Sequence, residues 1–143
     1  MNLLDVNMLI ALCDSMHVHH QAASQWFKRE SKSGWATCPI TENGFVRVMG
    51  QNAYPNGPQT PSGALKILKQ LLSLPGHQFW NDNLSVTDDS IFGTLNKIGP
   101  KQITDFYLLG LAVSHQGRLV TLDQRIHTTL TSTFKDALWL VKH

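Results

Sequence analysis

Four acidic side chains in this sequence occupy positions from which they can act together on a ligand. They are Asp5, Glu42, Asp105 and Asp123, four of the ten acidic residues in the chain. Two of them follow apolar segments typical of buried strands, and the other two fall in the first turns of segments typical of helices. Because strand ends and helix starts open on the same edge of a parallel α/β sheet, we expect the four carboxylates to share one cleft.

Such a group of carboxylates indicates a cation site. The acids repel one another unless some are protonated or a cation binds among them. Carboxylate oxygens suit Mg²⁺, which usually keeps several waters and takes only one or two protein carboxylates directly. A bound Mg²⁺ lowers the pKa of a water and neutralises charge on a phosphate, so the site suits phosphodiester hydrolysis. Each acid alone also fits a plainer role as a helix cap or helix start, although Asp5 fits it least because its surroundings are apolar.

The segments around the acids alternate between strand-like and helix-like patterns. Strands are predicted at residues 3–6, 35–38, 77–80, 118–122 and 137–141. One helix is predicted to begin at Met8 and another within residues 14–17. Further helices are predicted at 39–49, after Ser62, briefly at 91–95, and at 103–116. This alternation predicts an α/β fold, in which helices cover both faces of a parallel sheet.

Three polar or small residues are expected to set helix ends. Ser62 and Thr104 are predicted to cap the helices that follow them, because a hydroxyl can accept from a free backbone N–H of the first turn. Gly117 is predicted to end the helix over 103–116 in the left-handed conformation.

Length and composition predict one domain, residues 1–143, with a net charge of +2 that neither demands nor excludes a polyanion. Cys13 and Cys38 stand in apolar contexts and are expected to be reduced thiols, as in a cytoplasmic protein. The apolar first dozen residues lack a basic start and contain Asp5, which argues against a signal peptide. No apolar run approaches the ~20 residues of a membrane span.

Four segments of the chain resemble, in order, the motifs of PIN-domain ribonucleases. The segments are residues 3–9 (LLDVNML), 38–48 (CPITENGFVRV), 103–112 (ITDFYLLGLA) and 117–123 (GRLVTLD). The subgroup with the greatest resemblance is the VapC-type toxins of bacterial toxin–antitoxin pairs. One such motif is a weak signal, but four in order across nearly the whole chain are specific. The resemblance implies a three-layer α/β/α fold with a central parallel sheet of about four to five strands, the first of them in the middle.

The same resemblance implies an endoribonuclease that depends on Mg²⁺ or Mn²⁺ and uses all four acids as catalytic residues. Asp5 and Asp105 would hold the main cation. Glu42 and Asp123 would act through water or a second ion. The expected reaction is hydrolysis of RNA by a metal-activated water.

Supporting residues and partners are implied in the same way. Asn7 and Thr104 would orient the metal-binding carboxylates or waters. The implied partners are an RNA substrate such as tRNA or rRNA, a small antitoxin that blocks the cleft, and a second copy in a homodimer, with no membrane partner. The sequence departs from many relatives at Gln124-Arg125-Ile126, where another acid or an aromatic residue is common. This departure puts a second tightly held metal in doubt, and Arg125 either contacts a phosphate or lies in solvent.

Other functions are less well supported by the sequence. A catalytically inactive PIN-like module that binds RNA or protein would usually have lost one of the acids. A phosphotransfer enzyme with Asp5 as nucleophile needs a lysine near the third or fourth motif, whereas Lys97 and Lys101 fall in a predicted loop before Asp105. The histidines lack partners spaced for a zinc site, so surface positions are expected for them.

Overall fold

Five short parallel strands form the sheet in the computed structural model, which describes residues 1–93, 98–126 and 132–143. The strands are β1 (Asn2–Leu4), β2 (Trp35–Thr37), β3 (His77–Phe79), β4 (Arg118–Thr121) and β5 (Leu138–Leu140). Their order across the sheet is β3-β2-β1-β4-β5, and all pairings are parallel. The predicted parallel sheet is therefore confirmed, with the first strand at its centre.

The central strands send alternate side chains into two apolar cores on opposite faces of the sheet. In β1, Leu3 belongs to one core and Leu4 to the other. The register with β4 places Leu3 beside Leu119 and Leu4 beside Val120, and each pair shares a core. Burial on both faces explains why these strands read as continuous apolar runs in the sequence.

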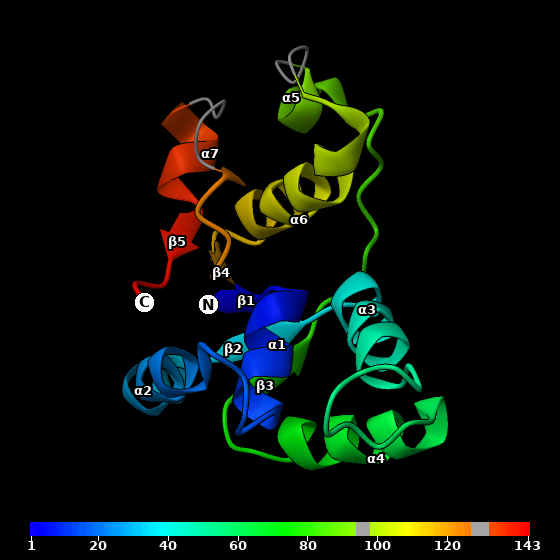
Figure 1. Ribbon diagram of the computed structural model, residues 1–143. Helices are drawn as coiled ribbons and strands as arrows, with labels where there is room; N and C mark the ends of the chain where they lie inside the picture. Colours follow the sequence, from blue (N-terminus) through cyan, green and yellow to red (C-terminus); the bar gives the residue numbers. More distant parts are fainter. Residues whose placement is uncertain (94–97, 127–131) are drawn as a thin grey trace.

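The helices form a layer on each face (Figure 1). One layer holds α1 (Val6–Cys13), α2 (His20–Glu30), α3 (Pro39–Met49) and α4 (Pro61–Leu72). The other holds α5 (Asp89–Phe92), α6 (Ile103–Ser114) and α7 (Ser132–Asp136), while single 3₁₀ turns cover Ser31–Ser33 and Pro100–Gln102. The predicted three-layer α/β/α architecture is confirmed. Within the described ranges, no helix has both the length and the apolar character needed to cross a membrane.

Several predicted helix boundaries are wrong by a few residues. Val6 is the first residue of α1 rather than part of the strand. Helix α2 begins at His20 and not at 14–17, because Asp14 is the C-cap of α1. The cap of α4 is Thr60, whose hydroxyl accepts from the backbone N–H of Gly63 at 3.1 Å, so Ser62 lies inside the first turn.

The region around α5, α6 and α7 differs most from the prediction. The N-cap of α6 is Gln102, which ends a 3₁₀ turn, so Thr104 is not the cap. The short helix α5 covers Asp89–Phe92 instead of 91–95, and residues 94–97 lie outside the described part. Helix α7 was not predicted. Cys13 and Cys38 are both free thiols, as expected.

Gly117 has a different role from the one predicted. Gln116, with a φ of 55°, is the residue in the left-handed conformation after α6. Gly117 lies against the start of β1, where a Cβ would overlap the carbonyl oxygen of Met1 and come within 3.0 Å of the Trp80 ring. The missing side chain lets β4 enter the sheet beside β1, because Arg118 donates its N–H to the same Met1 oxygen at 3.1 Å.

We therefore expect Gly117→Ala to lower the free energy of unfolding by about 1–3 kcal/mol, the usual cost of forcing an atom into a packed site. Equilibrium urea denaturation measures this change. Gly99→Ala is the matched control, since a Cβ at Gly99 has no neighbour within 4 Å. The control should stay within about 0.5 kcal/mol of the wild type. Equal losses in the two variants would contradict this packing role.

Candidate active site

Asp5 joins the central strand to helix α1 and is almost fully buried, with 7% of its surface exposed. Its backbone N–H donates to the carbonyl of Val120 in β4 at 2.9 Å. Its carboxylate caps α1 by accepting from the Val6 N–H at 2.7 Å, and it also accepts from the Thr121 hydroxyl at 2.8 Å. Burial raises the pKa of Asp5, the two hydrogen bonds act in the opposite direction, and the charge of Asp123 raises it further.

The Thr121 hydroxyl is the centre of the hydrogen-bond network around Asp5. Thr121 is completely buried at the end of β4. Its oxygen accepts from the Asn7 side-chain amide at 3.0 Å and from the Asp123 N–H at 3.1 Å, while its proton goes to Asp5. A hydroxyl has one proton and two lone pairs, so these three contacts use its full capacity. The sequence reasoning missed Thr121, and the only available signal was a hydroxyl residue two positions before Asp123 in an apolar strand.

Asn7 and Thr104, the two residues expected to support the acids, have different surroundings. Asn7 is half-buried, and besides its contact with Thr121 its side-chain oxygen accepts from the Leu122 N–H at 3.1 Å. It therefore connects the start of α1 to the end of β4. Thr104 is exposed in the first turn of α6, directly before Asp105.

Asp105 reaches the same edge of the sheet from helix α6. Its neighbour Phe106 is fully buried, which fixes the first turn of the helix against the sheet. Desolvation is the largest influence on its carboxyl, followed by the charges of Asp5 and Asp123, and together they raise the pKa of Asp105 to about 6. The charges of Asp5 and Asp123 therefore both act on the Asp105 carboxyl.

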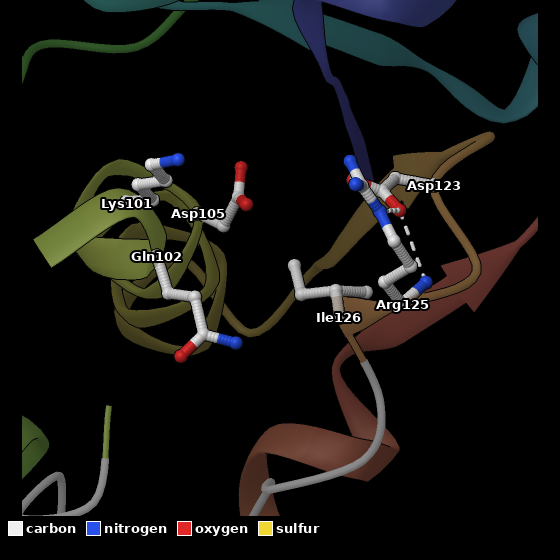
Figure 2. A pocket seen from close by; sticks show the side chains of 6 residues that line it. All are labelled: Lys101, Gln102, Asp105, Asp123, Arg125 and Ile126. Atoms are coloured by element: carbon white, nitrogen blue, oxygen red, sulfur yellow. Dashed lines mark hydrogen bonds and ion pairs between the residues drawn. The ribbon is translucent and has the colours of Figure 1, made fainter. Parts of the chain in front are cut away.

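Asp123 forms an ion pair with Arg125 (Figure 2). Its Oδ1 accepts from the Arg125 Nε at 3.1 Å, and its Oδ2 accepts from the Arg125 Nη2 at 3.1 Å. These hydrogen bonds lower the pKa of Asp123. Since 92% of the Arg125 side chain and 27% of the Asp123 side chain are exposed, the pair is weak and can be exchanged for another partner.

A cavity of about 220 Å³ lies between the start of α6 and the loop after β4. Figure 2 shows Asp105 and Asp123 on opposite sides of it. Its other lining residues are Lys101, Gln102, Arg125 and Ile126. The cavity thus combines two acids with two cations, a composition suited to a phosphate group and a metal ion together.

Glu42 lies in the first turn of α3, beside the end of the neighbouring strand β2. Its Oε2 accepts from the Thr37 hydroxyl at 2.6 Å, and Thr37 is the last residue of β2. Within the described residues, no three His, Cys, Asp or Glu side chains are grouped so as to hold a metal ion. The structure therefore couples Asp5, Asp105 and Asp123 electrostatically and holds Glu42 through Thr37.

The donor set still fits a hard divalent cation. All four groups supply carboxylate oxygens, the ligands that Mg²⁺ and Mn²⁺ prefer. The pKa values of Asp5 and Asp105 are raised by burial and by the charges around them. A cation would relieve both effects, because it stabilises the ionised form of each carboxyl.

Comparison with known proteins identifies relatives over nearly the whole chain. Residues 3–129, which include all four acids, match the family model of the PIN domain. The chain is 45% identical to Ribonuclease VapC44 of Mycobacterium tuberculosis over 127 residues, which cover 89% of each protein. It is 39% identical to Ribonuclease VapC39 of the same organism over 136 residues, 95% of this chain and 98% of the relative. Ribonuclease VapC38 is 40% identical over 128 residues, 90% of this chain and 89% of the relative.

The raised pKa of Asp105 predicts a pH-dependent gain of stability in Asp105→Asn. The carboxyl titrates near 3.8 in the unfolded chain and at about 6 in the folded protein. The folded state therefore binds the extra proton, and wild-type stability falls as pH rises through this window. The amide cannot ionise, so at pH 7.5 in EDTA we expect the variant to melt about 2–5 °C higher, a modest gain because solvent screens a half-buried group.

The gain should disappear at pH 4, where the wild-type carboxyl is protonated in the folded state. Differential scanning calorimetry at the two pH values measures both results. Asp123→Asn is the control, because Arg125 lowers the pKa of Asp123 and removal of this carboxyl should give no comparable gain. No gain in Asp105→Asn at pH 7.5, or an equal gain at pH 4, would contradict a carboxyl whose pKa is raised by burial and by the charges of Asp5 and Asp123.

Proposed function

Because this chain belongs to the PIN-domain family, we propose that it is a metal-dependent endoribonuclease and the toxin of a toxin–antitoxin pair. Its VapC ribonuclease relatives, 39–45% identical over most of the chain, place it among nucleases of the hydrolase class. The observation that carries the proposal is the buried carboxylate of Asp5 at the end of the central strand, electrostatically coupled to Asp105 and Asp123.

We assign the main cation, Mg²⁺ or Mn²⁺, to Asp5 and Asp105, with Glu42 and Asp123 acting through water or a second ion. When bound, the cation would lower the pKa of a water and neutralise charge on the phosphate. The pairing of Asp123 with Arg125 supports a secondary role for Asp123, because this carboxylate already has a positive partner.

The residues around the acids have positioning roles in this proposal. Thr121 and Asn7 hold Asp5 and the end of β4 in one arrangement through the contacts described above. Thr104, which is exposed beside Asp105, would orient a water or a ligand of the cation. Lys101 and Arg125 line the cavity and would contact RNA phosphates next to the bond that is cut.

We propose structured RNA, such as tRNA or rRNA, as the substrate. With a net charge of only +2, we expect recognition through a limited number of phosphate contacts rather than a broad basic surface. The proposal also includes a single domain over residues 1–143, a homodimer, an antitoxin that blocks the cleft, and a cytoplasmic location. A small neighbouring gene for a DNA-binding protein would support the toxin–antitoxin part.

We expect Asp5→Asn and Asp105→Asn each to reduce RNA cleavage by on the order of 10²-fold or more, because each removes a direct ligand of the cation. Gel analysis of end-labelled tRNA and rRNA fragments measures the rate, and circular dichroism checks that the variants are folded. Excess EDTA should abolish wild-type cleavage, and Mg²⁺ or Mn²⁺ should restore it. Unchanged cleavage in EDTA would contradict metal dependence. Tight RNA binding without any cleavage would indicate an inactive binding module instead.

Arg125→Gln should weaken RNA binding a few-fold and reduce the dependence of the binding constant on salt by about one phosphate contact. Fluorescence anisotropy with RNA in the Asp5→Asn background measures this without cleavage. Lys66→Gln, an equal loss of charge on α4, is the matched control and should leave binding unchanged. Equal effects of the two substitutions would mean that Arg125 acts only through net charge.

A further inference from the structure

A buried hydroxyl connects Glu42 to a histidine on the neighbouring strand. The Thr37 Oγ1 lies 2.6 Å from the Glu42 Oε2 and 2.7 Å from the His77 Nε2. Thr37 is completely buried at the end of β2, and His77 opens β3, the strand that pairs with β2. Three elements, β2, β3 and α3, therefore meet in one short chain of side chains.

Because the Thr37 hydroxyl has a single proton, the donor and the acceptor of both hydrogen bonds can be assigned. A carboxylate can only accept, so the single hydroxyl proton of Thr37 is donated to Glu42. The Thr37 oxygen is then an acceptor toward His77, and the His77 Nε2 must carry a proton. The chain thus runs from the imidazole N–H through the hydroxyl to the carboxylate, and a charged acceptor strengthens such hydrogen bonds.

The surroundings of His77 keep the ring in this orientation. The ring packs on Trp35 with their centroids 4.8 Å apart, and Trp35 is also its partner in the β2–β3 register. Trp35 is fully buried and donates its indole N–H to the Pro75 carbonyl at 3.0 Å, so the surface under the ring is fixed. His77 itself is half-buried, whereas surface positions were expected for the histidines.

We propose that His77 is a positioning residue for Glu42, which it orients through the Thr37 hydroxyl. The proposal rests on the proposed function, in which Glu42 is one of the four acids of the active site. Thr37 holds one carboxylate oxygen, Oε2, and thereby fixes where the other oxygen points. Without the His77 N–H, the Thr37 oxygen loses the donor that polarises it, so the hydrogen bond from Thr37 to Glu42 weakens and Glu42 is less firmly oriented.

A pair of substitutions at His77 tests the role of its N–H. Gln places an amide N–H close to the position of Nε2, whereas Leu fills similar space without a donor. We expect His77→Leu to reduce kcat by 10–100-fold with KM changed less than about threefold, as for other residues that orient ligands. We expect His77→Gln to restore kcat to within about threefold of the wild type. His115→Leu is the matched control, since His115 stacks on Trp80 on the other face of the sheet and should have wild-type kcat.

A double-mutant cycle and one spectroscopic measurement complete the test. Thr37→Val should lose at least as much kcat as His77→Leu, and adding His77→Leu to it should cost nothing further, because both act through one chain of bonds. Nitrogen-15 NMR should show the Nε2-protonated tautomer of His77 in the wild type and a loss of this preference in Thr37→Val.

The outcomes separate this proposal from the proposed function. If Asp5→Asn and Glu42→Gln are inactive but folded His77→Leu keeps wild-type kcat, the role of His77 is wrong and the nuclease assignment stands. Equal kcat losses in folded His77→Gln and His77→Leu would overturn it as well. If Asp5→Asn still cleaves RNA, the proposed function fails, whereas the NMR result tests the hydrogen bond independently of any cleavage.

Discussion

The burial of one carboxylate is the constraint on which the rest of this structure depends. Asp5 stands at the end of the central strand with apolar cores on both faces of the sheet. Burial of an unpaired charge costs far more than a protein of this size can afford without compensation. Two hydrogen bonds, from Val6 and Thr121, provide part of that compensation, yet burial still raises the pKa of Asp5. The remaining electrostatic cost is what a bound cation would relieve.

The acids at this edge of the sheet form two groups, and different residues stabilise the negative charge of each group. Asp5, Asp105 and Asp123 surround the junction of β1, β4 and α6, where Arg125 pairs with Asp123 and its charge also opposes the rise in the pKa of Asp105. Glu42, in the first turn of α3, accepts from Thr37 at the end of β2, and Thr37 is hydrogen-bonded to His77. A cation that binds between the two groups would draw on carboxylates that are already oriented, which lowers the cost of assembling the site.

The sequence predicted the parts of the fold that depend on local pattern. Apolar runs marked the central strands, and Pro39 marked the start of α3 correctly because proline suits the first turn of a helix. The prediction failed where a distant contact decides the outcome. Gly117 is needed because Met1 lies beside it, and no local pattern reports that contact. The true cap of α4, Thr60, lies before a proline that looked like part of a loop.

The same distinction between local pattern and tertiary contact applies to the candidate active site. The acids were found because charged residues next to apolar runs are visible in the sequence. The hydroxyls that hold them were missed: Thr121 is 116 residues from Asp5, and Thr37 lies near Glu42 in the sequence but in a different element, β2. A threonine in a strand is common for reasons of backbone preference alone, so its residue type carries no sign of such a contact.

The most direct test of the account is a titration of the metal-free protein with Mn²⁺ at pH 7.5 in the absence of RNA, followed by electron paramagnetic resonance. The account predicts that the wild type binds Mn²⁺, that Asp5→Asn abolishes binding, and that Thr121→Val weakens it by about 10-fold or more because Asp5 loses its buried hydroxyl partner. Equal Mn²⁺ binding by the wild type and both variants would contradict the claim that Asp5, held by Thr121, is the centre of the site.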